Sequence, residues 1–432
     1  MKTFLEFTQP LQIKLHQFCV AFAPKFSRPV HKFIQQMVFG ILKSGSVQLN
    51  SIARSLQEQI ALKKVTQRLS AHLDKPGLWR EVTTIALETQ ASKLRQCRFI
   101  IVDLSDIAKT YAQQMEGLAG VYDGSAGETA RGYWLCNITA VNDDATLVVP
   151  AYSELFSHQA EVTSENEKIL HAVEHVMPLG APDDILVEDR GGDRFTLLNA
   201  HVQAQRQCIV RQTGRRHLWY KGKSRPFKYL TQQTDLAWTY TVKRIHKNKI
   251  RQLHFDCGAM PVRLTATGEW LWLIVMKERR RGYCWLLCYF KNCTSAQEAV
   301  ELALKGYGLR WKIEEVHRQI KMDYHLEDIR LLRYEALKTM NALLWMAVSF
   351  LYTRLETLAH EIIHHPQLGL KNRNEPSDLM RFKFYKLALA FKIIMAVSQL
   401  YDKIIFPAAS SQMALAFAEP TKTVAPRLKN GG

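Results

Sequence analysis

The stretch RFIIVDLSD (residues 98–106) marks the point at which the chain changes from helical to strand patterning. A short run of β-branched and apolar residues that ends in acids is typical of a buried strand. Two further runs, YWLCNITAV (133–141) and ATLVVPAYSEL (145–155), continue this pattern. The elements expected to complete a mixed α/β sheet are a helix at 160–175, a strand at 183–190, a helix at 191–205 and a strand at 208–212.

Both flanks of this segment carry helical patterning, with apolar residues at intervals of three and four. In the N-terminal flank an apolar stripe over 62–73 defines a helix whose Lys63 and Lys64 face away from the stripe. Such a basic face suits a helix that reads a nucleic-acid groove, and it suits an ordinary solvated helix equally well. In the C-terminal flank helical periodicity runs over 295–400, and the last residues, rich in Lys, Pro and Gly, form a loose tail.

A β-rich segment interrupts the α/β pattern between 213 and 295. It contains WLWLIVM (270–276), whose alternating tryptophans are expected in a core, and YCWLLCYF (283–290), with KERRR (277–281) as the hairpin between them. It overlaps a basic tract, 206–251, in which thirteen Lys and Arg residues stand against one acid and are interleaved with aromatic residues. We expect an inserted β domain with a strongly basic surface.

The net charge narrows the class of partner. In 432 residues, 58 Lys and Arg against 40 Asp and Glu give a formal charge of +18, which favours nucleic acid or an acidic membrane surface. The N-terminus, MKTFLEFTQP, has charges that break its apolar runs, unlike a signal peptide. The longest apolar run, near 342–352, is well short of the roughly 18 residues that a membrane span needs. Nucleic acid, and no membrane, is the expected partner.

The eight cysteines are scattered, and only Cys284, Cys288 and Cys293 lie near one another. They form no Cys-x-x-Cys pair and have no His at ligand spacing, which disfavours a zinc site. We expect buried, reduced thiols.

The stretch GYGLRWKIEEVHRQIK (306–321) carries the strongest chemical signal. On a helix that advances about 100° per residue, Tyr307, Arg310, Glu314 and Lys321 fall within about 60° of one another. An apolar stripe lies beside them, so the helix is expected to pack on the sheet and hold its polar stripe at the rim of a cleft. A ladder of intrahelical ion pairs explains the charged residues but leaves the tyrosine unexplained.

Asp103 and Asp189 end the first and fourth predicted strands. Acids at strand ends project into the cleft where a sheet opens, and two from neighbouring strands can share a divalent cation. Strand-ending aspartates are more often caps or turn residues, so this pair alone is a weak signal.

Five polar neighbours are interpreted as supporting residues. His317 is expected to pack beside the apolar stripe. Asp106 and Asp193 are expected to cap helices or contact the site from behind, while Glu188 and Glu315 point away from the cleft.

The helical residues resemble the YREK signature of bacterial insertion-sequence transposases of the DDE, ribonuclease H-like superfamily. The spacing Tyr307-x2-Arg310-x3-Glu314-x6-Lys321 matches that signature without a gap. The resemblance covers nearly the whole chain, including a β-rich insertion ahead of the Glu. It implies a ribonuclease H-like mixed α/β core interrupted by that insertion, with helical regions at both ends.

Asp103 in VDLS resembles the first catalytic Asp of that family, and Asp189 in EDRGGD resembles the second. The resemblance implies that both residues, with Glu314, hold two Mg²⁺ or Mn²⁺ ions across a scissile phosphate. One ion would activate water or a 3′-hydroxyl, and the other would stabilise the leaving 3′ oxygen. The implied products are a nick, a hairpin, an opened hairpin and a strand joined to a target.

The resemblance also implies DNA contacts. Arg310 and Lys321 would clamp backbone phosphates of the transposon end, with Tyr307 beside them. Trp285 lies where the related enzymes stack a flipped base, although a Trp packed in the core of the insertion is an equal alternative. The expected phosphate contacts elsewhere are Arg215, Arg216, Lys221, Lys223, Arg225, Lys63 and Lys64.

We expect four regions. They are an N-terminal helical DNA-binding region (1–90), a catalytic core (91–212 with 296–350), the basic insertion (213–295) and a C-terminal helical region with a loose tail (351–432). The resemblance implies a bacterial cytoplasmic transposase that excises and integrates an insertion sequence at its terminal inverted repeats. It would act as a homodimer in a synaptic complex on double-stranded DNA. Two alternatives remain open: a DNA nuclease without strand transfer, and a catalytically silent, transposase-derived DNA-binding regulator.

Overall fold

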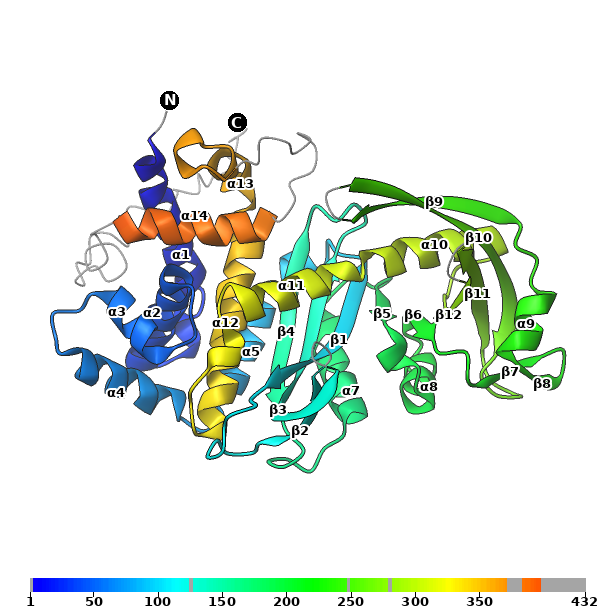
Figure 1. The fold of residues 1–432 in the computed structure, drawn as a ribbon, viewed down its shortest axis with the longest axis horizontal. Helices are drawn as coiled ribbons and strands as arrows, with labels where there is room; N and C mark the ends of the chain where they lie inside the picture. The colour runs from blue at the N-terminus through cyan, green and yellow to red at the C-terminus, as the bar shows by residue number, and fades with distance from the viewer. Residues whose placement is uncertain (1–2, 124–126, 247–248, 279–281, 371–382, 398–432) are drawn as a thin grey trace, which may run out of the picture.

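The computed structural model of the protein describes residues 3–123, 127–246, 249–278, 282–370 and 383–397. It places a long mixed sheet beside a group of helices that both ends of the chain contribute (Figure 1). Three expected features lie partly outside the described residues: the C-terminal tail, the turn at 279–281 and the basic tract at 247–248.

The first half of the sheet comes from the segment that changes to strand patterning. Its strands are β1 (Phe99–Ala108), β2 (Ala119–Asp123), β3 (Glu128–Val141), β4 (Val148–Phe156), β5 (Ile185–Glu188) and β6 (Gln207–Gln212). β1 pairs antiparallel with β3 and parallel with β5, and β5 pairs parallel with β6. The predicted order of consecutive strands, helix, strand, helix and strand is confirmed, and β2 is an additional strand that the sequence pattern did not indicate.

Asp103 does not end its strand, contrary to the expectation. β3 pairs with β1 as far as Ala108, so Asp103 lies inside β1 opposite Asn137. The parallel pairing with β5 stops one residue earlier, at Val102 opposite Glu188. Asp103 therefore stands at the point where β5 ends and β1 continues with a partner on one side.

The second half of the sheet comes from the β-rich segment. Its elements are β7 (His217–Tyr220), β8 (Lys223–Pro226), α9 (Phe227–Gln233), β9 (Trp238–His246), β10 (Lys249–Arg263), β11 (Trp270–Glu278) and β12 (Gly282–Tyr289). β12 pairs antiparallel with β6, so within the described residues all twelve strands belong to one sheet. The β7–β8 hairpin forms its far edge, separated from β5 by β6, β12, β11 and β10. The strand cysteines Cys208, Cys257 and Cys288 are buried free thiols, as expected.

Helices cover both faces of the first half of the sheet. Alternate residues of β1 enter two separate cores: Phe99 and Ile101 face one, and Ile100 and Val102 face the other. This explains why the strand is apolar throughout instead of alternating. The helices on the first face are α10 (Ala296–Leu309), α11 (Trp311–Met322) and α12 (Tyr334–Arg354), and those on the second are α7 (Glu165–Val176) and α8 (Phe195–Gln203).

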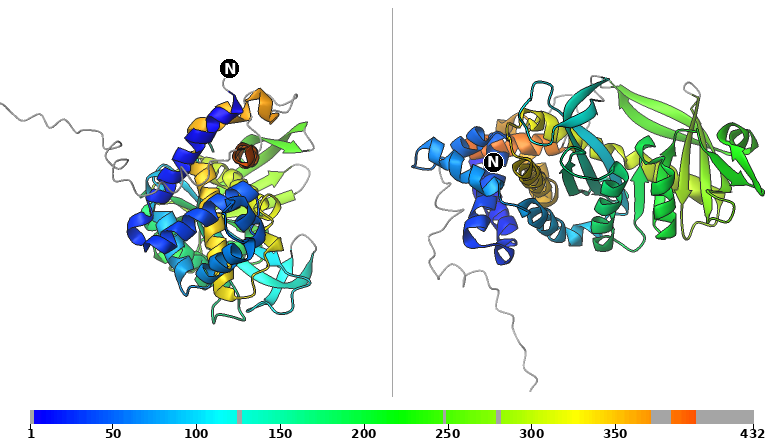
Figure 2. Two further views of the ribbon diagram at one scale, coloured as in Figure 1. Left: turned by 90° about the vertical axis from the view of Figure 1, so that its left-hand side faces the viewer. Right: turned by 90° about the horizontal axis from the view of Figure 1, so that it is seen from below.

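The two ends of the chain form one helical group, at the opposite end of the molecule from β7 and β8 (Figures 1 and 2). Its helices are α1 (Thr8–Val20), α2 (Arg28–Ser44), α3 (Leu49–Leu56), α4 (Leu62–Leu73), α5 (Leu78–Glu88), α6 (Ala91–Leu94), α13 (Glu356–Ile363) and α14 (Lys383–Val397). α12 is buried over 336–353 and packs against α2, α5 and β4, which joins this group to the sheet. No helix in the described part of the chain is long and apolar enough to span a membrane.

A buried ion network fastens α12 to α7 and β4. Lys338 lies 2.5 Å from Glu161 and 3.5 Å from Glu154, and Lys168 lies within 2.7 Å of both carboxylates. Partial burial raises the pKa of Glu161, but hydrogen bonds from Lys168, Lys338 and Tyr334 outweigh it and lower the pKa to about 2. The network therefore holds two carboxylates ionised inside the protein.

We predict that Lys338→Ala lowers the free energy of unfolding by about 1–3 kcal/mol, because it removes one of the two ammonium groups that neutralise Glu154 and Glu161 and leaves Lys168 to serve both. Urea unfolding at pH 7 measures this. Lys305→Ala is the matched control: its pair with Asp143 is exposed, so its loss should cost about 0–1 kcal/mol.

The same network predicts an acid dependence. The depressed pKa of Glu161 stabilises the fold above its ordinary pKa of 4.5, and this contribution is lost as the pH falls toward 2. Glu161→Gln should flatten that part of the stability profile. Equal losses for the Lys338 and Lys305 variants would contradict a buried network.

Candidate active site

Helices α10 and α11 carry the polar stripe across the sheet. They meet at Arg310, whose backbone keeps helical angles, so the two helices follow one another closely in direction. Gly306 permits the close approach of α10: a Cβ atom there would lie 2.5 Å from the Ile209 side chain and 2.7 Å from Phe99. The close packing brings Tyr307, the next residue, to the end of β5.

Two side chains of the stripe, Tyr307 and Arg310, contact Asp189, and a third, Glu314, joins them through Arg310. The Tyr307 hydroxyl donates to Asp189 Oδ1 at 3.0 Å, and Arg310 Nη1 lies 3.8 Å from Asp189 Oδ2. Arg310 Nη2 donates to Glu314 Oε1 at 2.5 Å. The Arg310 side chain is only 8% exposed, so its charge acts at short range on both carboxylates.

The electrostatic environment shifts the pKa values of Asp103 and Asp189 in opposite directions. Burial raises the pKa of Asp103 to about 7; Arg310 opposes the shift, and the negative charges of Asp189 and Glu314 add to it. Burial also acts to raise the pKa of Asp189, but Arg310, a backbone hydrogen bond and Tyr307 lower it overall. The three carboxylates therefore lie within electrostatic range, and Asp103 is the one with least compensation.

His317 lies beside Asp103, on the next turn of α11. It is buried, as expected, and its Nε2 lies 2.8 Å from the Asn137 side-chain amide. Its Nδ1 is 3.9 Å from Asp103 Oδ2. Burial, with the nearby charges of Lys321 and Arg310, lowers the pKa of His317 to about 3, so the ring stays neutral.

Lys321 lies further along α11, away from Asp189. Its Nζ is 3.6 Å from Asp106 and 3.1 Å from Glu327. The contact agrees with the supporting role expected for Asp106. Glu188, on the opposite face from Asp189 as expected, is buried beside His201, with 3.4 Å between Glu188 Oε1 and His201 Nε2.

Arg211 was not singled out from the sequence. It lies between Asp189 and a small cavity. Its Nη1 donates to the Tyr307 hydroxyl at 3.1 Å and lies 3.5 Å from Asp189 Oδ1. It also lines a cavity of about 200 Å³ with Arg190, Arg215 and Trp285. This cavity has three guanidinium groups, an aromatic wall and no acidic lining residue, which suits an anionic, planar ligand.

Trp285 is held firmly at this cavity. Its indole Nε1 donates to Thr231 Oγ1 at 2.9 Å, and the Phe227 ring packs edge-on against it. Tyr283, two residues earlier on β12, lies nearly parallel to it, with ring centroids 6.5 Å apart. Trp270, expected in a core, is instead 55% exposed, with the Arg263 guanidinium 4.1 Å above its ring.

The expected phosphate contacts separate into three places. Arg215 lies at the cavity, whereas Arg216 is bound to Asp193, whose side chain is 2% exposed. The β7–β8 hairpin places Lys221, Lys223 and Arg225 on the far edge of the sheet. Lys63 and Lys64 are exposed on α4, in the helical group.

A second residue missed from the sequence is Trp311. It follows Arg310 directly and is 47% exposed. On the helical wheel it falls about 40° from Tyr307, so it belongs to the polar stripe. Its position on that wheel was the signal that could have identified it.

The donor set suits a hard divalent cation, since Asp103, Asp189 and Glu314 supply only carboxylate oxygens. Their mutual repulsion, visible in the raised pKa of Asp103, is what a bound cation would relieve. In the structure, the Arg310 guanidinium supplies the positive charge beside Asp189 and Glu314. Among the described residues no three acidic, His or Cys side chains are gathered closely enough to hold a metal ion.

No protein-family model matches this chain, and no curated protein matches it. Among solved structures, the chain is similar to a piggyBac transposase determined by cryo-EM in a synaptic complex with hairpin DNA. The TM-score is 0.43 and the sequence identity 9%, over 98% of this chain and 85% of that one. A likeness of this size carries no argument about function, which must come from the site itself.

We predict that two neighbouring arginines differ strongly in what they contribute to the free energy of unfolding. Arg216→Ala should lower the free energy of unfolding by about 3–5 kcal/mol, because it leaves the buried Asp193 carboxylate without its guanidinium. Arg215→Ala, at an exposed position, should change it by no more than about 0.5 kcal/mol. Chemical denaturation of both variants measures this. Similar losses of unfolding free energy would show that the ion pair between Arg216 and Asp193 does not stabilise the fold.

Proposed function

We propose that this protein is a DNA transposase, a metal-dependent endonuclease and strand transferase with a ribonuclease H-like core. The observation that carries the proposal is the contact of Tyr307 and Arg310 with Asp189 and of Arg310 with Glu314, with Asp103 in electrostatic range on the adjacent strand. The mixed sheet, with β1 parallel to β5 and antiparallel to β3, supports such a core.

Asp103, Asp189 and Glu314 would hold two Mg²⁺ or Mn²⁺ ions, which supply an activated oxygen nucleophile and stabilise the leaving oxygen. Asp189 is kept ionised by Arg310 and Tyr307, so it is ready to bind a cation near neutral pH. His317 stays neutral and packs beside the Asp103 carboxylate.

The arginines would hold the phosphodiester in place. Burial and the Asp189 charge raise the pKa of Tyr307 to about 12, so its hydroxyl stays protonated and donates. With the carboxylates engaged by cations, Arg310 and Arg211 become available to a DNA phosphate beside them. Positioning and charge neutralisation supply most of the rate enhancement in such a reaction.

The small cavity would take the terminal nucleotide. Its base would stack on Trp285, and Arg190 and Arg215 would neutralise its phosphate. The exposed Lys63 and Lys64 on α4 would contact the transposon end, and Lys221, Lys223 and Arg225 would track its backbone at the far edge of the sheet. Two copies on two DNA ends complete the proposed assembly.

We expect the purified protein to cleave the inverted repeats that flank its gene with Mg²⁺ and not with Ca²⁺, whose longer bonds and looser coordination place the phosphate poorly. Asp189→Ala should bind the same DNA and cut it at least about a hundredfold more slowly. Gel assays of binding and cleavage measure both.

Glu315→Gln is the matched control, since Glu315 pairs with Lys312 rather than with the site. Its cleavage should match the wild type. Undiminished cutting by Asp189→Ala would disprove the assignment of the three carboxylates. Cleavage that never proceeds to strand joining would instead favour a nuclease.

Trp285→Ala should slow hairpin formation by about fivefold or more while leaving the first nick nearly unchanged, because stacking is needed only after the terminal base leaves the duplex. Denaturing gels separate nicked from hairpin products. Trp270→Ala, which removes an exposed tryptophan from β11, is the control. Equal loss of both steps would assign Trp285 a packing role.

A further inference from the structure

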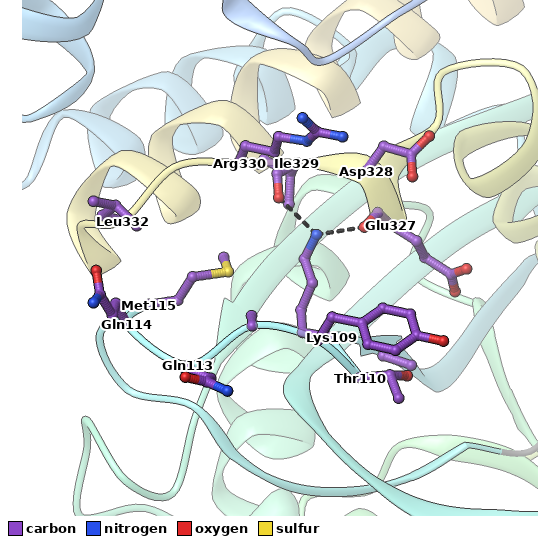
Figure 3. A pocket seen from close by; sticks show the side chains of 13 residues that line it. Lys109, Thr110, Gln113, Gln114, Met115, Glu327, Asp328, Ile329, Arg330 and Leu332 are labelled. Atoms are coloured by element: carbon purple, nitrogen blue, oxygen red, sulfur yellow. Dashed lines mark hydrogen bonds between the residues drawn. The ribbon is translucent and has the colours of Figure 1, made fainter.

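A cavity of about 640 Å³ lies beyond the carboxylate site, where the chain leaves β1 (Figure 3). One wall is the segment that follows β1, from Lys109 to Met115, and the other is the turn after α11, from Glu327 to Leu332. The volume is within the range of small-ligand sites. The roles proposed above for the carboxylates and Trp285 do not use this cavity.

A buried cation forms part of this cavity. Lys109 is 7% exposed, and its Nζ donates to the carbonyl oxygens of Glu327 and of Ile329, the latter at 2.6 Å (Figure 3). An ammonium has three donors, and both acceptors are neutral. Within the described residues no carboxylate lies at ion-pair distance from Lys109, so its charge is uncompensated at contact. An ammonium held in this way has a third hydrogen that it can donate to an anionic ligand.

The two acids of the cavity compensate Lys109 only from a distance. Burial lowers the pKa of Lys109 to about 8, and the charges of Asp328 and Glu327 oppose that shift. Arg330 lines the cavity as a second cation, and Glu327 is also paired with Lys321, at 3.1 Å. The lining thus offers two cationic donors, Lys109 and Arg330, to one negative group such as a phosphate.

Two apolar side chains of the lining are exposed. Tyr111 is 95% exposed and Leu332 is 57% exposed, so the tyrosine ring is open to a base that enters the cavity. Gln113 and Gln114, on the same segment as Lys109, also line the cavity and can hydrogen-bond to the edge of a base (Figure 3). A phosphate and a stacking ring within one cavity describe a nucleotide.

The cavity is continuous with the polar stripe of α11. Lys321, the last residue of that stripe, contacts Asp106 on β1 and Glu327 in the cavity wall. Along β1, Asp103 and Ala108 are about 17 Å apart at the usual rise per residue. A DNA strand held at the carboxylates would reach the cavity within a few nucleotides.

We propose that this cavity binds one nucleotide of the DNA strand that leaves the carboxylate site, with its phosphate at Lys109 and Arg330 and its base against Tyr111. The inference rests on the proposed function and extends it with a second contact for the same strand. It requires neither a bound metal ion nor cleavage.

Photo-crosslinking tests the assignment with the full chain and no added metal. The probe is an eight-nucleotide oligothymidylate with one thymine replaced by 5-iodouracil, which joins to a stacked aromatic ring on irradiation. Mass spectrometry should locate a crosslink at Tyr111. Tyr111→Ala should abolish it and weaken binding of the oligonucleotide about fivefold or more. Arg330→Ala should weaken binding and reduce its dependence on log salt by about one.

Tyr122→Ala is the matched control, because Tyr122 is 58% exposed on β2 and does not line the cavity. It should keep both the crosslink and the affinity. Thermal unfolding of each variant checks that the fold is intact. Crosslinks elsewhere only, with unchanged affinity in Tyr111→Ala, would overturn the assignment. Displacement of the oligonucleotide by an equal concentration of thymidine 5′-monophosphate would overturn it in favour of a free-nucleotide site.

The two proposals fail separately. A crosslink at Tyr111 in a protein that does not cut DNA with Mg²⁺ would support the nucleotide site in the cavity and contradict the nuclease activity. Metal-dependent cutting without that crosslink would support the nuclease activity and contradict the nucleotide site.

Discussion

The Arg310 guanidinium is the charge on which the rest of the candidate site depends. Carboxylates buried close together repel one another and lose hydration, which costs free energy unless a cation compensates them. Arg310 hydrogen-bonds to Glu314 and lies beside Asp189, so one side chain connects the end of β5 to α11. Asp103 has no such contact, and the pKa of its carboxyl is raised to about 7. Burial raises the pKa of Asp103, whereas Arg310 contributes to a lowered pKa at Asp189.

The sheet determines where that charge can sit. α10 approaches the strands closely because Gly306 has no side chain to meet Phe99 and Ile209. The backbone keeps helical angles through Arg310, which lets residues on both sides of that point reach the same cleft. A bulkier residue at 306 would move Tyr307 away from Asp189 and so remove a hydrogen bond that, after Arg310, helps to lower the pKa of Asp189.

Local patterns were sufficient to predict the helical stripe and most strands of the core, since both follow from the spacing of residues within one element. The position of Asp103 inside β1 depends on the length of β3, a partner some thirty residues away in sequence. Arg211 meets Tyr307, which lies 96 residues later, through tertiary contact alone. Arg216 was expected to be a free cation, and only the fold reveals that Asp193 holds it.

The continuity of the sheet constrains any DNA that enters the site. Glu188 lies opposite Val210 on β6, and Gln212, two residues on, lies opposite Trp285 on β12. The separation of Asp189 and Trp285 is thus set by two ladders of backbone hydrogen bonds rather than by packing between independent domains. Such ladders resist sliding, because a one-residue shift would turn every side chain to the other face. In the proposed function, a terminal base that stacks on Trp285 would therefore have to leave its duplex, since the ladders hold the ring in place.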